Sequence, residues 1–144
     1  MSRKGSFSRV SRQSQKPMYG PRAVLACGYH DEDLARLHLF FDVLPLRNLP
    51  VVLAGDADAH TPVGDLLKRR PEAPPEAPSG LPAAIVMSGL SEKELHMLVG
   101  AYRQTGLPRP LWASLTPISE SWPLTQLLAE LAAERERLEG PQPR

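Results

Sequence analysis

The sequence predicts an α/β fold: a small four-stranded parallel sheet of order 2-1-3-4, with helices on both faces, built from two βαβα pseudo-repeats. Three observations predict this fold. Short apolar runs that do not alternate with polar residues are typical of strands buried on both faces. Segments with the apolar spacing of amphipathic helices lie between these runs. The two halves of the chain also align with each other at one constant offset.

Four apolar runs are the predicted strands. The first three end at Gly28, at Gly55 and at Ser88-Gly89, where the chain is expected to turn. The runs span residues 23–27, 50–54, 83–87 and 111–115. Because no run alternates apolar with polar side chains, we expect helices to cover both faces of the sheet.

Four helices are predicted between and after these strands, each with apolar side chains on one face. Pro45 is expected to end the first helix. Pro62 and Pro123 occupy the first position of the second and fourth helices, which proline favours. Ser91 and Glu94 form a capping box at the start of the third. The apolar faces comprise Leu34, Leu37, Phe41 and Leu44; Val63, Leu66 and Leu67; Leu95, Leu98, Val99 and Tyr102; and Leu124, Leu127, Leu128 and Leu131.

The length and composition predict a single domain. The chain has 144 residues, of which 42% are hydrophobic, which is enough for one core and too little for two ordinary domains. The first 22 residues carry six basic and no acidic side chains and few apolar ones, so we expect them to be disordered. The expected divisions are a basic tail at 1–22, a domain at 23–138 with halves 23–70 and 83–138 joined by a proline-rich linker at 71–82, and a disordered tail at 139–144.

An offset of 61 residues aligns the two halves without gaps. Nine identities occur over the 48 positions 21–68, among them Gly28 with Gly89 and Pro62 with Pro123. One βαβα unit has only two strands and cannot cover its own apolar faces, whereas two units side by side make a four-stranded sheet. In a parallel sheet of this kind, ligands bind in the crevice beyond the carboxyl ends of the strands. We therefore expect a binding site at that edge.

The first cluster expected at this edge follows the second strand and contains Asp56, Asp58 and His60. Two carboxylates and an imidazole at this spacing are able to converge on a metal ion. The pattern is also similar to the strand end of haloacid-dehalogenase-type phosphatases, which implies Asp56 as nucleophile and Asp58 as general acid/base. The plainer interpretation, which we favour, is a polar loop that leads into the helix opened by Thr61 and Pro62.

Two further clusters are expected at the same edge. Cys27 and His30 follow the first strand and could form a nucleophile pair, although a cysteine ending a buried strand is usually a small apolar core residue. Trp122 comes just before the last helix. It could be an exposed residue that anchors a partner, although the simpler interpretation is a hydrophobic staple that packs back onto the helix. Ser88, Ser91 and Thr116 complete the expected ligand or partner edge.

Several classes of protein are excluded or disfavoured. The single cysteine excludes a disulfide framework and a cysteine-built zinc site within the chain. The chain has no GxxxxGK(S/T) loop, no GxGxxG after a strand and no GxSxG elbow, so the usual nucleotide and hydrolase signatures are missing. No apolar run is long enough to cross a bilayer. We therefore predict no metal, leave the cofactor unknown, and expect a cytoplasmic protein with no membrane partner.

The segment from Met87 to Leu95 (MSGLSEKEL), the Gly106-Leu107-Pro108 turn and the stretch from Thr116 to Trp122 together resemble a family. It is a small, uncharacterised bacterial domain-of-unknown-function family (DUF 3783). The resemblance covers residues 23–138 and is closest from residue 83 onward. It implies the domain limits and a bacterial cytoplasmic setting, and it implies no chemistry.

The function is not fixed by these motifs. The leading hypothesis is a non-catalytic binding or regulatory domain, and not an enzyme, that holds an unknown protein or small ligand at the strand edge. The first alternative is an RNA- or ribosome-associated protein that uses its basic tail. That tail's candidate residues are Arg3, Lys4, Arg9, Arg12 and Lys16. The second alternative is a metal-dependent, phosphatase-like enzyme that uses Asp56 and Asp58.

Overall fold

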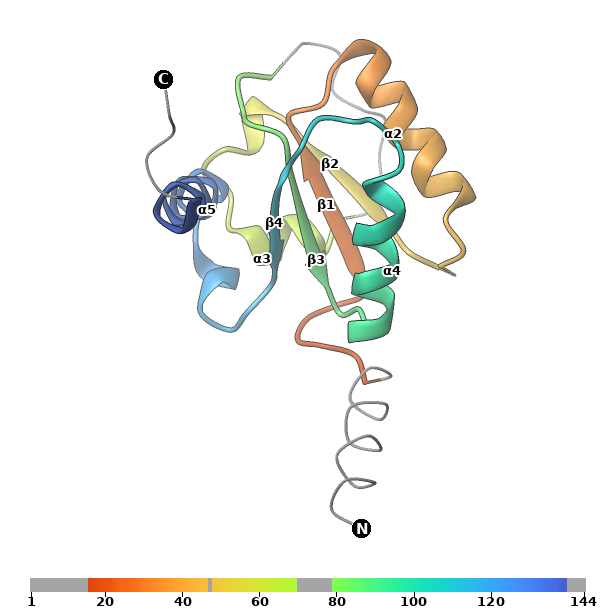
Figure 1. The fold of residues 1–144 in the computed structure, drawn as a ribbon. Helices are drawn as coiled ribbons and strands as arrows, with labels where there is room; N and C mark the ends of the chain where they lie inside the picture. Colours follow the sequence, from red (N-terminus) through yellow and green to blue (C-terminus); the bar gives the residue numbers. More distant parts are fainter. Residues whose placement is uncertain (1–15, 47, 70–78, 140–144) are drawn as a thin grey trace.

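A computed structural model describes residues 16–46, 48–69 and 79–139. Strands and helices follow one another in the predicted order, βαβα twice (Figure 1). The elements are β1 (Ala23–Cys27), α2 (Asp31–Val43), β2 (Val51–Ala54), the 3₁₀ turn η1 (Asp56–Asp58), α3 (Val63–Leu67), β3 (Ala84–Ser88), α4 (Glu92–Tyr102), β4 (Leu111–Ser114), the 3₁₀ turn η2 (Ser119–Ser121) and α5 (Leu124–Glu139). The predicted α/β class is therefore confirmed.

The four strands form one sheet of order β2-β1-β3-β4, as predicted. The sheet is mixed, however, because β1 pairs parallel with β2 and β3 pairs parallel with β4, whereas β1 and β3 are antiparallel. The prediction of an all-parallel sheet is wrong. Strands buried on both faces are apolar throughout whichever way their neighbours run, so the residue pattern does not report direction. The rule of right-handed crossovers constrains strand pairs that are joined through one crossover, whereas β1 and β3 are separated by one strand and three helical segments.

The antiparallel joint changes where the strands end. The carboxyl ends of β1 and β2 lie at one edge of the sheet, and those of β3 and β4 lie at the opposite edge (Figure 1). The predicted crevice, with the ends of all four strands on one side, therefore does not exist. Its proposed residues are divided between two distant edges.

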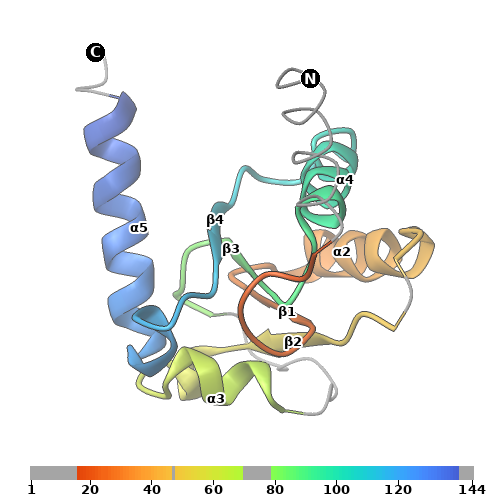
Figure 2. The same ribbon diagram turned by 90° about the horizontal axis from the view of Figure 1, so that it is seen from below.

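Helices cover both faces of the sheet. Figure 2 shows α2 and α4 on one face, and α3 with the start of α5 on the other. Alternate residues of β1 point to the two sides: Val24 and Ala26 belong to the core beneath α2 and α4, while Leu25 belongs to the core beneath α3 and α5. No helix within the described residues is both long and apolar enough to span a membrane.

Ordered contacts begin before Ala23, where the sequence predicted the tail to end. Pro17 forms an isolated bridge with Ser91, and the N–H of Met18 donates to the carbonyl of Leu90 at 2.8 Å. Arg22 forms an ion pair with Glu94 at 2.8 Å. The segment 16–22 is therefore attached to the start of α4. Most of the predicted basic tail, including Arg3, Lys4, Arg9 and Arg12, lies outside the described residues, as do residues 71–78 of the linker and 140–144.

Candidate functional site

The two aspartates after β2 bind the protein's own loops. The Oδ1 atom of Asp56 accepts hydrogen bonds from the hydroxyl of Ser79 at 3.1 Å and from the N–H of Gly80 at 3.0 Å. Asp58 accepts from the N–H of Gly55 at 3.0 Å and forms an ion pair with Arg69 at 2.6 Å. Both carboxylates thus stabilise the loop around η1 and the chain entering β3, which agrees with the polar-loop interpretation.

Cys27 and His30 are close in sequence but do not form a catalytic pair. The Cys27 thiol is 3% exposed, and burial raises its pKa to about 12. A thiol with such a pKa stays protonated at neutral pH and is a poor nucleophile. The Nδ1 atom of His30 accepts from the N–H of Ser79 at 3.4 Å, and its side chain does not cap α2. His60 is exposed in the turn after η1.

The residues after β3 and β4 serve as local caps. Ser91 and Glu94 form the predicted capping box, since each side chain accepts from the backbone N–H of the other, at 3.1 and 3.0 Å. Thr116 and Ser119 are paired in the same way: the N–H of Thr116 donates to the Oγ of Ser119 at 3.1 Å, and the N–H of Ser119 donates to the Oγ1 of Thr116 at 3.0 Å. The hydroxyl of Ser88 is buried and has no hydrogen-bond partner among the described residues. No ligand-binding arrangement results from these residues.

Trp122 follows η2 in the connection between β4 and α5. It is half-buried against the core beneath α3 and α5, and its carbonyl accepts from the N–H of Val63 at 2.9 Å. This position fits the packing role rather than an exposed anchor. Within the part of the chain that the structure describes, no three His, Cys, Asp or Glu side chains are grouped closely enough to hold a metal ion.

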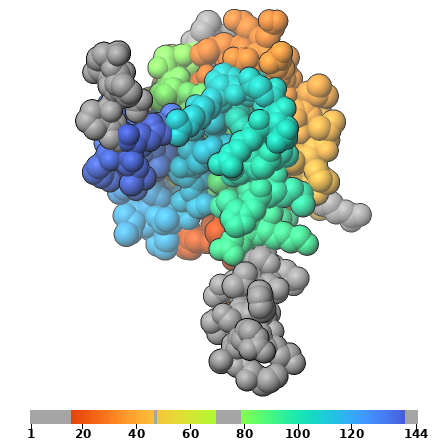
Figure 3. Space-filling view, viewed as in Figure 1, coloured from red at the N-terminus to blue at the C-terminus, as the bar shows by residue number. Residues whose placement is uncertain are grey.

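A cavity of about 500 Å³ lies elsewhere, between the end of α4 and the projecting half of α5. Figure 3 shows the atoms of β4 set back between these two helices. A volume of this size suits a small organic ligand. The lining residues are Tyr102, Arg103, Gly106, Leu107, Arg109, Pro110, Leu111, Trp112, Leu131, Glu134, Arg135, Leu138 and Glu139, and we call this set the β4 groove.

The length of α5 makes one wall of the β4 groove. The first turns of this 16-residue helix bury Leu124, Leu127 and Leu128 against the sheet. The helix then continues past the sheet edge beside β4, where most of its residues are exposed (Figure 2). Leu138, in the last turn, is 78% exposed. The projecting half of α5 therefore encloses the groove rather than the core.

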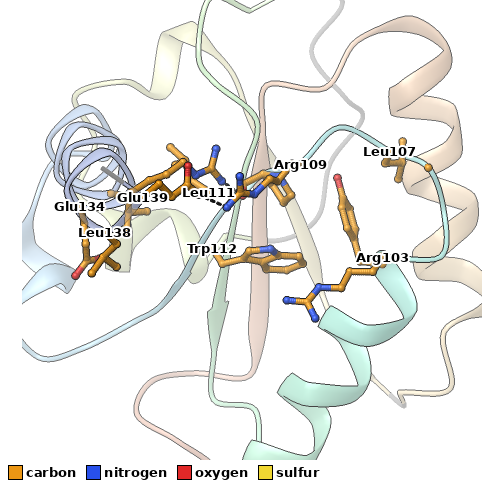
Figure 4. A pocket seen from close by; sticks show the side chains of 13 residues that line it. Arg103, Leu107, Arg109, Leu111, Trp112, Glu134, Leu138 and Glu139 are labelled. Carbon is orange, nitrogen blue, oxygen red and sulfur yellow. Dashed lines mark hydrogen bonds and ion pairs between the residues drawn. The ribbon is translucent and has the colours of Figure 1, made fainter. Parts of the chain in front are cut away.

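The indole of Trp112 forms the floor. Tyr102 packs edge-on against it, with 5.2 Å between ring centroids and an angle of 84° between planes. Two hydrogen bonds fix Tyr102 in turn. Its hydroxyl shares one with the hydroxyl of Tyr29 at 2.7 Å and donates the other to the carbonyl of Pro108 at 2.5 Å. These contacts hold the half-buried indole in one orientation before any ligand arrives. Figure 4 shows the Trp112 and Arg103 side chains reaching into the same space.

The rim of the β4 groove is cationic. Arg109 forms an ion pair with Glu139, and Arg135 donates to the carbonyl of Pro110. The guanidinium of Arg103 has no hydrogen-bonded or ionic partner among the described residues, and it faces the cavity (Figure 4). The lining contains three arginines and two glutamates, which gives it a formal net charge of +1. Residues 23–144 as a whole have a net charge of −5. The groove is thus a positive site on an acidic body.

No residue of the β4 groove is among the site residues predicted from the sequence. Arg135 and Glu134 have the pattern of a solvated helix end, and Trp112 lies in the weakest apolar run. Two signals were available: a tryptophan within a short strand, and a last helix that extends well beyond its final core leucine. Neither signal places Arg103 beside them, because that depends on how α4 and α5 pack around β4.

Comparison with known proteins gives one family. Residues 83–138 match the family described as Domain of unknown function (DUF3783). This confirms the resemblance expected from the sequence over β3, α4, β4 and nearly all of α5. No curated protein and no solved structure gives a significant match to the chain.

Proposed function

Since residues 83–138 form a domain of a family whose function is unknown, we propose a function from geometry: a non-catalytic binding module that holds a nucleoside phosphate in the β4 groove. The observation that carries the proposal is the pairing of a fixed, half-buried indole with a guanidinium that has no partner among the described residues. This site replaces the strand-end crevice expected from the sequence.

The indole of Trp112 supports an aromatic ligand. Stacking of a base on an aromatic side chain contributes about 1–3 kcal/mol and does not depend strongly on which base is present. Because Tyr102 already fixes the ring, little side-chain entropy remains to be lost on binding. The surrounding leucines Leu111, Leu131 and Leu138 supply the apolar walls such a ring requires.

The arginines support an anion on that ligand. Hydrogen bonds from a guanidinium to a phosphate are charge-assisted and about twice as strong as neutral ones. Arg103 is available for this contact without breaking an existing one, while Arg109 and Arg135 add positive charge at the rim. A nucleoside phosphate combines a planar ring with an anion, and the β4 groove offers an indole for the ring and guanidinium groups for the anion.

The chemistry of the lining supports binding rather than turnover. The groove contains no histidine, cysteine or hydroxyl nucleophile beside a base among its described lining residues. The Tyr102 hydroxyl is held by Tyr29 and Pro108, and burial raises its pKa further from neutrality. Asp56 and Asp58, the residues of the phosphatase alternative, are bound by their own loops in a different part of the molecule.

We also propose that the two halves are repeated units and that only the second acquired this groove. At the offset of 61, the positions equivalent to Arg103, Arg109 and Trp112 are Asp42, Asn48 and Val51. The helix equivalent to α5 is α3, which has 5 residues instead of 16. The first half therefore has neither the aromatic floor, nor the cations, nor the projecting wall.

Isothermal titration calorimetry on the full chain tests the function, with AMP, adenosine, inorganic phosphate and a short oligoadenylate as ligands. AMP is expected to bind more tightly than adenosine or phosphate. Arg103→Gln should reduce the affinity for AMP to that for adenosine. Trp112→Leu should weaken AMP at least about fivefold, the lower limit for a lost stack. Arg36→Gln, which changes an exposed arginine on α2, is the matched control and should change neither affinity.

The ligand series also distinguishes a free nucleotide from an RNA strand. Tighter binding of oligoadenylate than of AMP identifies a strand as the natural ligand, and equal binding identifies a mononucleotide. Equal affinities for AMP and adenosine, or no binding of either, would contradict the proposed function.

The RNA alternative based on the tail remains a second proposal, and a separate feature supports it. Six basic and no acidic residues occur in the first 22 residues, which is enough charge for salt-sensitive contacts with phosphates. Deletion of residues 1–15 should abolish oligoadenylate binding if the tail carries it, while AMP binding in the groove should persist. Oligoadenylate binding that survives the deletion and is lost in Arg103→Gln would remove the tail from the account.

A further inference from the structure

The register of the sheet relates the two halves of the chain. In the antiparallel joint, Leu25 lies opposite Val86, and these two residues are also 61 positions apart, which is the offset of the sequence alignment. The flanking pairs agree: Val24 pairs with Val51 and Ala84 with Leu111, so each partner lies 27 residues further along the chain. Rotation by half a turn about an axis through the Leu25–Val86 pair therefore exchanges the two halves of the sheet.

A second contact, on the face of the sheet covered by α3 and α5, also joins residues that are 61 positions apart. Pro62 and Pro123 are 61 residues apart and face each other in an isolated antiparallel bridge. The N–H of Val63 donates to the carbonyl of Trp122 at 2.9 Å, and the N–H of Leu124 donates to the carbonyl of Thr61 at 3.1 Å. Each of these two bonds is the image of the other under the same exchange. This contact joins loops rather than strands, so it is independent of the β1–β3 pairing.

The close approaches at the strand ends are equivalent too. Gly28 has a φ of +82°, and a Cβ there would lie 2.3 Å from the carbonyl oxygen of Pro82. Gly89 has a φ of +69°, and a Cβ there would lie 2.7 Å from the carbonyl carbon of Pro21. Pro82 and Pro21 are also 61 positions apart. In each half, the first strand is followed by a glycine that lies against the segment leading into the first strand of the other half. A side chain at that position would collide with the backbone of this segment.

Neither half has a core of its own. Among the described residues, the core beneath α2 and α4 contains twelve buried residues, six from each half. On the same basis, the core beneath α3 and α5 contains fifteen, eight from the first half and seven from the second. A separated half would expose these apolar side chains together with one unpaired edge of β1 or β3, which favours pairing with another strand.

From these relationships we infer that the β1–β3 joint, with the Pro62–Pro123 contact behind it, is an interface between two self-complementary βαβα units. The partner this surface fits is a second unit of the same kind, and in this chain the first half supplies that partner. The family match supports the inference, because it begins at residue 83 and ends at residue 138 and so covers a single unit. The inference does not depend on the function of the β4 groove.

A cut between the two units tests this inference in the full chain. A specific protease site is inserted between Arg69 and Ser79, and the purified chain is cleaved after folding. The two fragments should remain together as a 1:1 complex with an unchanged circular dichroism spectrum. Their melting temperature should become dependent on protein concentration, because dissociation now accompanies unfolding. Two isotopically distinct cut preparations should also form mixed complexes, which native mass spectrometry detects.

Two variants make the test specific. In the cut protein, Leu25→Ala should raise the dissociation constant of the fragments at least about tenfold, since this leucine lies at the centre of the interface. Leu39→Ala changes a leucine on α2 that is 62% exposed and should leave the constant unchanged. The inference is overturned if the fragments separate into independently folded domains, if both unfold on cleavage, or if Leu39→Ala and Leu25→Ala have equal effects.

Discussion

Leu25 and Val86 lie directly opposite each other at the centre of the antiparallel joint, and each occupies the same position in its own half of the chain. Both side chains are at most 1% exposed and belong to the core beneath α3 and α5. The pair therefore lies at the point where the two halves meet with their strands in opposite directions. That direction also decides on which side of the sheet the β4 groove lies. Because β3 and β4 run opposite to β1, the end of α4 lies at the same edge of the sheet as the ends of β1 and β2.

Truncation of this pair should cost much of the stability. Leu25→Ala is expected to lower the free energy of unfolding by about 3 kcal/mol, and Val86→Ala by about 2 kcal/mol, through lost burial and the cavities left behind. Because the side chains are neighbours, the double variant should differ from the sum of the two by at least about 0.5 kcal/mol. Urea unfolding measures all three values. Additive losses would show that the two residues do not interact.

Ser88→Ala should stabilise the protein. The Ser88 hydroxyl is buried without a hydrogen-bond partner among the described residues, and its equivalent in the first half is the apolar Cys27. Removal of an unsatisfied hydroxyl should raise the free energy of unfolding by about 1 kcal/mol. Ser121→Ala, at an exposed serine, should change it by less than about 0.5 kcal/mol. A clear loss of stability in Ser88→Ala would mean that the hydroxyl has a partner in solution.

The Cys27 thiol should be unreactive in the folded protein. Burial raises its pKa to about 12, so the thiolate is scarce at pH 8 and the sulfur is also inaccessible to reagent. Ellman's reagent should therefore label the native protein slowly and label it fully in concentrated urea. Labelling of the native protein at the rate of a free thiol would restore Cys27 as a candidate nucleophile.

The ion pair between Arg22 and Glu94 should make stability depend on pH. The side-chain hydrogen bond from Arg22 is the main cause that lowers the pKa of Glu94 below its ordinary value of 4.5. This contribution is therefore present above pH 4.5 and is lost as the pH falls through the lower pKa of the folded protein. Because both groups are partly exposed, we expect it to be less than about 1 kcal/mol.

Urea unfolding of the parent and of Glu94→Gln, at pH 7 and at pH 3, isolates this charge effect, since glutamine keeps an acceptor for the capping box. The parent should be the more stable at pH 7, and the difference should shrink toward zero at pH 3. A difference that is the same at both values of pH would show that charge is not the cause.

Local signals in the sequence located the elements but not their relative direction. Pro45 and the Ser91–Glu94 box predict helix ends correctly because each acts through nearby backbone groups. Pro62 and Pro123 predict the helix starts to within one residue, since α3 begins at Val63 and α5 at Leu124. The apolar runs predict strands buried on both faces, and such runs look the same in parallel and antiparallel pairs. The position of β3 beside β1 is set instead by contacts between halves, such as the Pro62–Pro123 bridge.

The prediction of a single crevice is wrong for a related reason. Gathering Cys27, Asp56, Ser88 and Thr116 into one crevice required all four strands to run the same way. The β4 groove depends on packing that no local pattern encodes, namely the extension of α5 beyond the sheet and the placement of Arg103 beside Trp112.

The most direct test of the proposed function is an NMR titration of the ¹⁵N-labelled full chain with AMP. The chain has two indole N–H groups, and only that of Trp112 lies in the β4 groove. The account predicts progressive shifts of the Trp112 indole and of the Arg103 backbone amide, with the Trp122 indole unchanged. No shift at Trp112 in millimolar AMP, or a larger shift at Trp122, would contradict it.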